Sequence, residues 1–133
     1  MIAMPWTFLD YVDSNGSNQI ETWLESRPKG VRAKLTAILT IARAERQLSG
    51  PRFKVLHGAG GILEIRFLEG RVAYRPLACY GPRRGEVTLL AGATKRNNQY
   101  RPPGILDTAN ARWAEILLDR RRVVATCLLR LGS

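Results

Sequence analysis

Histidine and cysteine are scarce in this chain of 133 residues, which holds one histidine, His57, and two cysteines, Cys79 and Cys127. A single histidine excludes paired-histidine metal sites and ribonuclease chemistry that needs two histidines. The two cysteines lie far apart, so they form neither a CxxC motif nor a disulfide framework. We therefore expect a protein without a metal or other cofactor, working in a reducing compartment such as the cytoplasm.

Long apolar runs and the common enzyme motifs are also missing. No segment approaches the roughly 18 uninterrupted apolar residues of a membrane span, and the first residues do not have the pattern of a signal peptide. The sequence has no GxSxG, Walker loop or HExxH motif, and the glycine-rich run at 58–61 lacks the strand–helix context of a dinucleotide site. A membrane contact and these enzyme classes are not expected.

Basic residues are abundant instead. Lysine and arginine number 21 against 11 aspartate and glutamate, which gives a formal charge of +10, and most of the basic residues are arginines. Residues 51–105 hold ten basic residues but only three acidic ones, Glu64, Glu69 and Glu86. So few carboxylates disfavour a two-metal nuclease, while the excess of cations indicates a polyanionic partner.

The hydrophobic pattern predicts one α+β domain. Asn18 followed by Glu21 resembles a capping box, and the stripe at Val31, Leu35 and Leu39 indicates a second helix, with Ile38 and Ala42 beside it. We expect the order β-α-α-β-β-β-α, with an N-terminal strand and a helix hairpin packed on a curved antiparallel sheet and a helix near the C-terminus. The elements expected are a strand at 6–12, helices at about 18–27 and 28–50, a short strand at 53–56, strands at 62–68, 71–77 and 86–93, and a helix at about 109–120.

Two segments are left without an assigned regular element. The segment 94–104, with two asparagines and two prolines, is expected to be a loop. The apolar residues 123–131 are compatible with an extension of the last helix, an edge strand or a partner surface.

The basic residues of the sheet half form the candidate site. Arg66 and Arg75 fall on successive strands of a hairpin with a Glu69-Gly70 turn, Lys54 lies on the strand before it, and Lys95 follows the last strand. If all four converge on one face, they can orient an RNA phosphodiester, stabilise charge at phosphorus and assist proton transfer without a metal. His57 is a further candidate acid or base because of its intrinsic pKa. The alternative is that these are solvated surface charges.

Several motifs of this region together resemble a known family. They are Phe53–Gly58, Ile62–Phe67, Arg71–Arg75, Val87–Leu90, Thr94–Arg96, the prolines 102–103, and Ala109 with Arg112. This combination resembles the phage Gp49-like, HigB-type branch of the RelE/ParE toxin superfamily. The resemblance spans about residues 7–120 and implies a single toxin domain at 1–120, followed by a tail at 121–133 with no assigned role.

The resemblance implies a toxin of a type II toxin–antitoxin pair, with a microbial RNase-like fold, that cleaves mRNA in the ribosome without a metal. It assigns Arg66 and Arg75 as phosphate and transition-state ligands, and Lys54 and Lys95 as RNA-contacting lysines, one of them a candidate for proton transfer. Glu64 is expected to support its neighbours, and Tyr74 to face the core. Further RNA contacts are expected from His57, Arg83, Arg84 and Arg96.

The partners implied are a cognate antitoxin, often a helix-turn-helix protein in this branch, together with mRNA and the ribosome. Two other functions on the same scaffold stay open at this point. One is inhibition of DNA gyrase without nuclease activity, as in ParE-like toxins. The other is a phage-derived module that only binds RNA or a protein. No role is transferred to Tyr100, which precedes the last helix.

Overall fold

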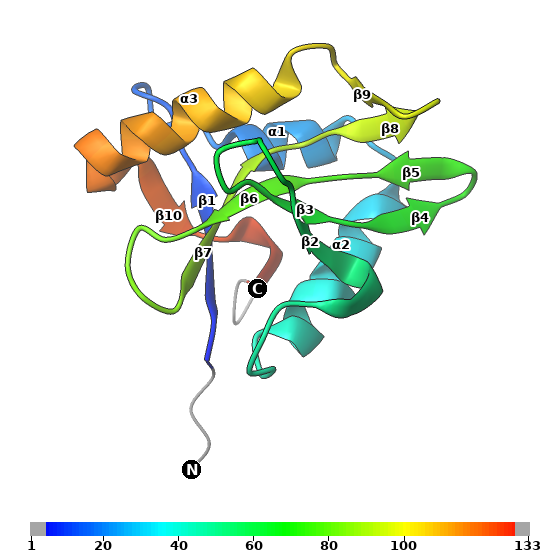
Figure 1. The fold of residues 1–133 in the computed structure, drawn as a ribbon, viewed down its shortest axis with the longest axis horizontal. Helices are drawn as coiled ribbons and strands as arrows, with labels where there is room; N and C mark the ends of the chain where they lie inside the picture. Colours follow the sequence, from blue (N-terminus) through cyan, green and yellow to red (C-terminus); the bar gives the residue numbers. More distant parts are fainter. Residues whose placement is uncertain (1–4, 130–133) are drawn as a thin grey trace.

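The computed structural model describes residues 5–129 and confirms the α+β class (Figure 1). The helices are α1 (Gln19–Glu25), α2 (Lys29–Ala42) and α3 (Ile105–Leu118), with short 3-10 turns η1 (Gly50–Arg52), η2 (Arg120–Arg122) and η3 (Cys127–Leu129). The strands are β1 (Thr7–Tyr11), β2 (Phe53–Val55), β3 (Leu63–Ile65), β4 (Phe67–Glu69), β5 (Val72–Tyr74), β6 (Leu77–Tyr80), β7 (Glu86–Ala91), β8 (Thr94–Arg96), β9 (Gln99–Arg101) and β10 (Val123–Ala125).

The strands of the described residues form two sheets. A six-stranded sheet has the order β10-β1-β7-β6-β3-β2, and a four-stranded sheet has the order β4-β5-β8-β9. Neighbouring strands are antiparallel, except that β1 runs parallel to β7. The chain passes between the sheets at Arg66, at Arg75-Pro76 and at Gly92-Ala93.

The prediction of single strands at 62–68 and 71–77 is therefore wrong, because each is interrupted where the sheets meet. Pro76 has no N–H group to donate to a ladder, which explains the break between β5 and β6. At the other bend, Arg66 donates its backbone N–H to the carbonyl of Arg52, while Ile65 donates to the carbonyl of Pro76. Both bends are thus fixed by partners from separate segments.

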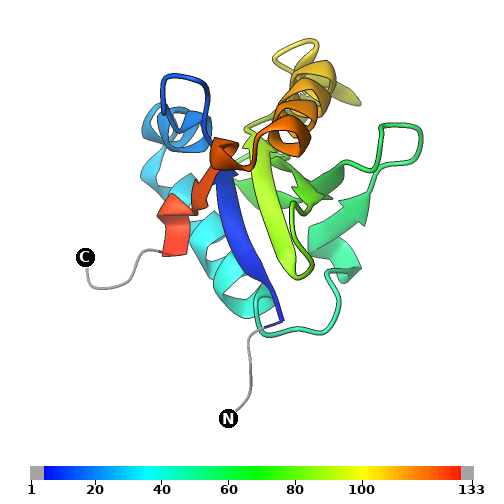
Figure 2. The same ribbon diagram turned by 90° about the vertical axis from the view of Figure 1, so that its left-hand side faces the viewer.

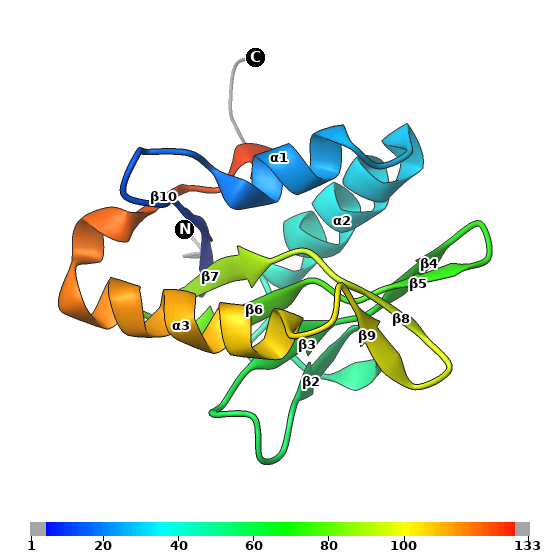
Figure 3. The same ribbon diagram turned by 90° about the horizontal axis from the view of Figure 1, so that it is seen from above.

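Helices cover both faces of the six-stranded sheet: α1 and α2 lie on one side and α3 lies on the other (Figure 3). On the α1/α2 side, Leu63 and Ile65 of β3 join the buried cluster that contains Leu35 and Leu39 of α2. Ile62 belongs to the second cluster, with α3. Since side chains alternate along a strand, Glu64 faces the α3 side.

The first two helices largely follow the sequence pattern. Asn18 caps α1, accepting a hydrogen bond from the backbone N–H of Glu21 at 3.0 Å, as predicted. The stripe of α2 is buried, but this helix ends at Ala42, earlier than the predicted end near residue 50. Beyond Ala42 the next positions on the stripe are the exposed Glu45 and Arg46, so a longer helix has no apolar face to bury.

The segment 94–104 is not the predicted loop. It forms a hairpin in which Lys95 pairs with Tyr100, and the third helix follows directly, starting at Ile105. The turn consists of Asn97 and Asn98, whose φ angles are 51° and 62°. Two successive positive φ values define the type I′ turn that suits a tight hairpin, and asparagine tolerates them better than most residues.

The C-terminal segment adds an edge strand, which is one of the three alternatives left open by the sequence. Strand β10 pairs antiparallel with β1, with Leu9 opposite Ala125 (Figure 2). Beyond it, Cys127 donates its backbone N–H to the buried carboxylate of Asp10 at 2.9 Å, and Leu128 enters the core cluster. Residues 121–129 therefore pack on the same body as the preceding chain, while 130–133 lie outside the described residues.

Within residues 5–129, every helix is too short or too polar to cross a lipid bilayer.

Candidate functional site

The centre of the candidate site is the carboxylate of Glu64 on β3, whose side chain is 1 % exposed. Its Oε1 atom lies 3.1 Å from Nε of Arg66 and 3.8 Å from Nε of Arg75. Its other oxygen, Oε2, accepts a hydrogen bond from the hydroxyl of Tyr100. A buried carboxylate is stable only when it is paired and hydrogen-bonded, and these three side chains meet that need.

The bends between the sheets bring the two arginines to this carboxylate. Glu64 and Arg66 are two residues apart in an extended chain and so share a face. Arg75 arrives from the neighbouring bend, where its backbone N–H donates to Ala93 at 2.8 Å. The Arg66 side chain is 37 % exposed and that of Arg75 is 15 % exposed. Arg66 therefore presents its guanidinium group to solvent, whereas Arg75 lies deeper, with Nη1 donating to the carbonyl of Tyr74 at 2.8 Å.

The β8–β9 hairpin brings Lys95 and Tyr100 to the same side. The two residues are directly paired, and Nζ of Lys95 lies 4.8 Å from the centroid of the Tyr100 ring, a cation–π contact. Burial, followed by the hydrogen bond to Glu64, raises the pKa of Tyr100 well above its ordinary value. The hydroxyl therefore stays protonated at neutral pH and acts as a donor rather than as a base.

Lys54 completes the set of four residues proposed from the sequence as catalytic. It is exposed on β2 and is the direct cross-strand partner of Glu64. Directly opposed residues of an antiparallel pair project from the same face about 5 Å apart. The structure thus places Arg66, Arg75 and Lys54 beside one buried carboxylate, and Lys95 on the ring of Tyr100, which donates to that carboxylate.

The other predicted RNA contacts lie farther out. Arg96 is exposed beside the Asn97-Asn98 turn, and His57 is exposed in the turn that follows β2. Arg83 and Arg84 are exposed in the loop between β6 and β7. That loop is at the opposite end of β6 from Arg75, roughly 20 Å along the strand, so the structure does not bring these two arginines to the Glu64 centre.

Tyr100 is the residue of the site to which the sequence assigned no role. The Asn97-Asn98 pair was a usable signal, because a tight hairpin at this position returns Tyr100 to the level of Lys95. Tyr74, by contrast, faces the core as expected: it is buried and stacks on Phe67, with ring centroids 5.4 Å apart.

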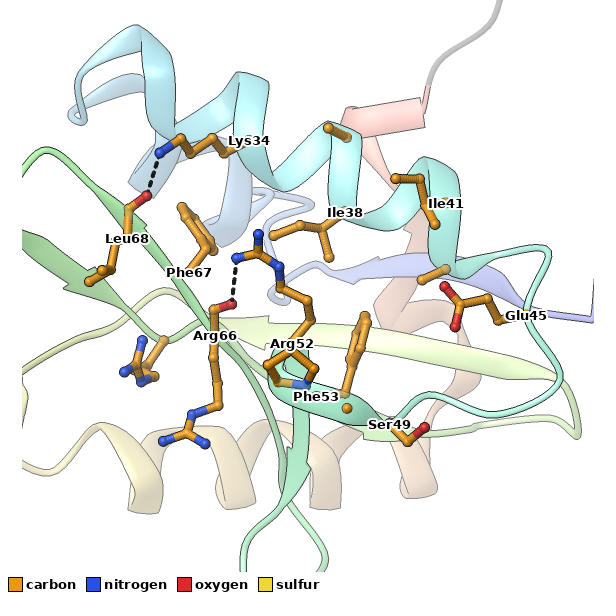
Figure 4. A pocket seen from close by; sticks show the side chains of 15 residues that line it. Lys34, Ile38, Ile41, Glu45, Ser49, Arg52, Phe53, Arg66, Phe67 and Leu68 are labelled. Atoms are coloured by element: carbon orange, nitrogen blue, oxygen red, sulfur yellow. Dashed lines mark hydrogen bonds between the residues drawn. The ribbon is translucent and has the colours of Figure 1, made fainter.

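A groove of about 850 Å³ opens beside the site, between α2 and the segment from η1 to β4 (Figure 4). Its lining includes the apolar Ile38 and Ile41 of α2 and Leu68 of β4. The guanidinium group of Arg52 lies in the groove and donates to the carbonyl of Arg66 at 3.4 Å, while the Arg66 side chain points away from α2. The groove and the Glu64 centre therefore share the backbone of this bend.

Among residues 5–129, no group of three or more histidine, cysteine, aspartate or glutamate side chains is placed to hold a metal ion.

Comparison with known families identifies the chain at the family level. The model described as "Phage derived protein Gp49-like (DUF891)" matches residues 22–114, which is more than half of the chain. The chain belongs to the Gp49-like family. This is a toxin-like family of toxin–antitoxin systems. The match contains every site residue named above, whereas β1 and β10 of this Gp49-like protein lie outside it. No curated protein and no solved structure matches the chain.

Proposed function

We propose that this Gp49-like protein is the toxin of a type II toxin–antitoxin pair and cleaves mRNA on the ribosome without a metal, as in the HigB-type branch that it resembles. The observation that carries the proposal is the buried Glu64 carboxylate that holds Arg66 and Arg75, with Lys54 and Lys95 beside it. Three cations beside one internal counterion, with a fourth on the neighbouring Tyr100 ring, make a site for a phosphodiester.

The reaction proposed is in-line attack by a ribose 2′-oxygen on the adjacent phosphorus. The bond from the 2′-oxygen to phosphorus forms, the bond to the 5′-oxygen breaks, and the products are a 2′,3′-cyclic phosphate and a 5′-hydroxyl. Negative charge grows on the phosphoryl oxygens, where the guanidinium groups of Arg66 and Arg75 stabilise it. One proton leaves the 2′-hydroxyl and one reaches the leaving oxygen, and Lys54 and Lys95 are the candidates for these transfers.

Glu64 serves in this proposal as a positioning residue. Its Oε1 atom faces the Nε atoms of both arginines, which leaves the terminal nitrogens of Arg66 available to a phosphate. Preorganised cations stabilise developing charge without reorganising during the reaction. Tyr100 holds the second carboxylate oxygen and so fixes the rotation of Glu64.

An antitoxin is the partner that the proposal requires. The groove beside α2 supports this, because its apolar residues Ile38, Ile41 and Leu68 suit the apolar face of a helix. The guanidinium group of Arg52, which lies in the same groove, suits an acidic residue on such a helix. A helix seated there would reach the backbone that carries the site and hinder access of RNA.

The test is primer extension on a reporter mRNA in a cell-free translation reaction, with the same mRNA without ribosomes in parallel. We expect the wild-type protein to cut within codons only during translation, and an Arg66→Ala, Arg75→Ala double variant to lose about 100-fold or more of this activity. The control is an Arg46→Ala, Arg120→Ala double variant, which removes the same charge at exposed positions. Intact mRNA with wild-type protein, or cleavage that survives removal of Arg66 and Arg75, refutes the proposal.

A further inference from the structure

A second pocket, of about 520 Å³, lies on the other face of the β8–β9 hairpin, between α1 and the start of α3. The register pairs Thr94 with Arg101, and both line this pocket. Because side chains alternate along each strand, they project from the face opposite to Lys95 and Tyr100. The hairpin thus has the Glu64 centre on one face and this pocket on the other.

Three arginines from separate elements line the pocket: Arg27 after α1, Arg101 at the end of β9, and Arg112 on α3. No acidic residue is among its lining residues in the described chain. Arg112 is held in place, because its Nη1 donates to the carbonyl of Leu90 at 2.8 Å. The Arg112 guanidinium carbon also lies 5.2 Å from the Tyr11 ring centroid, so this arginine is held by the protein itself. A pocket lined by three arginines and no carboxylate is suited to an anion, and the forks of the exposed Arg27 and Arg101 fit a phosphate group.

Trp23 forms a fixed wall of this pocket. A Cβ atom built on Gly92 would lie 1.9 Å from the indole ring, so the ring packs directly on the backbone that follows β7. The edge of Tyr74 meets the ring at an interplanar angle of 71°. The Arg27 guanidinium carbon lies 5.7 Å from the ring centroid, a cation–π contact that positions this exposed side chain at the pocket. The arginine is therefore presented to a ligand from a rigid support.

We infer that this pocket binds a backbone phosphate of single-stranded RNA, at a nucleotide a short distance along the strand from the one held at Glu64. The placing of another nucleotide of the same strand at the Glu64 centre rests on the proposed function. Strand β9 is the outer strand of the four-stranded sheet, so RNA can pass around its edge from one face of the hairpin to the other. Arg96, exposed beside the hairpin turn, adds a cation near this path.

The experiment is fluorescence anisotropy of a labelled 12-nucleotide RNA, without ribosomes, at several salt concentrations. The test variant is Arg27→Gln, Arg101→Gln, and the matched control is Arg46→Gln, Arg120→Gln; all four positions are exposed and the charge removed is equal. We expect the test variant to bind about tenfold more weakly. The slope of log K against log salt concentration should become shallower by about 0.7 for each RNA phosphate that the variant no longer neutralises. The control should stay within about twofold of wild type.

Equal weakening in both double variants would overturn the inference, because it would reflect only the general positive field. Competition with inorganic phosphate and with uridine monophosphate distinguishes a free anion from an RNA backbone phosphate as the ligand of the pocket. If the test variant loses affinity for these small anions but keeps its affinity for RNA, the pocket takes a free anion and the RNA assignment is wrong. Cleavage in the translation assay is read separately, so RNA binding that depends on Arg27 and Arg101 stands even if the protein cuts no mRNA.

Discussion

Replacement of Glu64 by glutamine tests whether one buried carboxylate organises the site. Glu64→Gln keeps the size of the side chain and an oxygen that accepts from Tyr100, but removes the negative charge. Two guanidinium groups then lie beside a neutral amide, and their mutual repulsion is no longer compensated. The free energy of unfolding should fall.

The size of the effect follows from the two ion pairs. At an effective dielectric constant of about 20, charges separated by the 3.1 Å and 3.8 Å of these pairs attract by roughly 5 and 4 kcal/mol. Desolvation of the buried carboxylate offsets several kcal/mol of this, and removal of one partner from a buried pair usually costs about 3–5 kcal/mol. Arg66 is 37 % exposed and its share is screened by water, so we expect a decrease near the lower end, about 3 kcal/mol.

The assay is urea denaturation followed by circular dichroism. With an m value of about 1.5 kcal/mol/M, the decrease corresponds to a fall of about 2 M in the midpoint. The control is Glu69→Gln, which breaks the exposed pair with Lys34 at 3.1 Å and should cost at most about 1 kcal/mol. A Glu64→Gln midpoint within about 0.3 M of wild type, or equal decreases in both variants, would refute the role assigned to Glu64.

Two further predictions concern packing and a buried tyrosine. Gly92→Ala should lower the free energy of unfolding by about 1–3 kcal/mol in thermal unfolding, because its new methyl group overlaps the Trp23 ring. The control is Gly30→Ala, which should be neutral or stabilising because its nearest neighbour is the flexible end of a glutamate side chain. Equal melting temperatures of the two variants would contradict this reasoning. Burial, followed by the hydrogen bond to Glu115, raises the pKa of Tyr11 from 10.0 to about 12. Between these pH values the folded state keeps a proton that the unfolded chain loses. The free energy of unfolding should therefore fall as the pH rises from about 10 to about 12. Glu115→Gln should shrink that fall in urea titrations at each pH, and an unchanged pH dependence would speak against it.

Features with local causes could be predicted from the sequence. The N-cap of α1 depends on Asn18 and Glu21 alone, and the buried face of α2 depends on a spacing contained in one helix. The predicted end of α2 is too late because it relies on Gly50-Pro51 as the stop signal. Residues 43–47 contain no large apolar side chain, and this already leaves the stripe without an apolar continuation.

The bend at Arg66 was not predicted, because its cause lies far away in the chain. Residues 63–67 alternate strictly between apolar and charged side chains, and nothing local marks Arg66 as a bend. The backbone N–H of Arg66 donates to the carbonyl of Arg52, and no sequence pattern pairs these two residues. Pro76 was a local signal for the break between β5 and β6, and the Asn97-Asn98 pair was one for the β8–β9 hairpin.

In the candidate site too, some features could be predicted from local sequence and others depend on tertiary structure. Alternation along a strand is sufficient to put Glu64 and Arg66 on one face, and charge selected Arg75 and Lys95. The burial of Glu64 and the arrival of Tyr100 depend on tertiary structure and could not be read from spacing. Arg83 and Arg84 were chosen by charge alone, although a loop that follows β6 must lie at the end away from Arg75.

The different exposures of the two arginines give them different parts in the proposed reaction. Arg66 reaches solvent and makes one short ion pair through Nε, so its terminal nitrogens are open to an arriving phosphate while Arg75 lies deeper beside Glu64. The Arg75 Nε atom is buried, lies 3.8 Å from the carboxylate and has no hydrogen-bonding partner among the described residues, so Arg75 is bound to Glu64 by charge rather than by a hydrogen bond. On the proposed mechanism, the exposed Arg66 therefore captures the phosphodiester, while the deeper Arg75 stays beside Glu64 and stabilises the charge that develops on the phosphoryl oxygens.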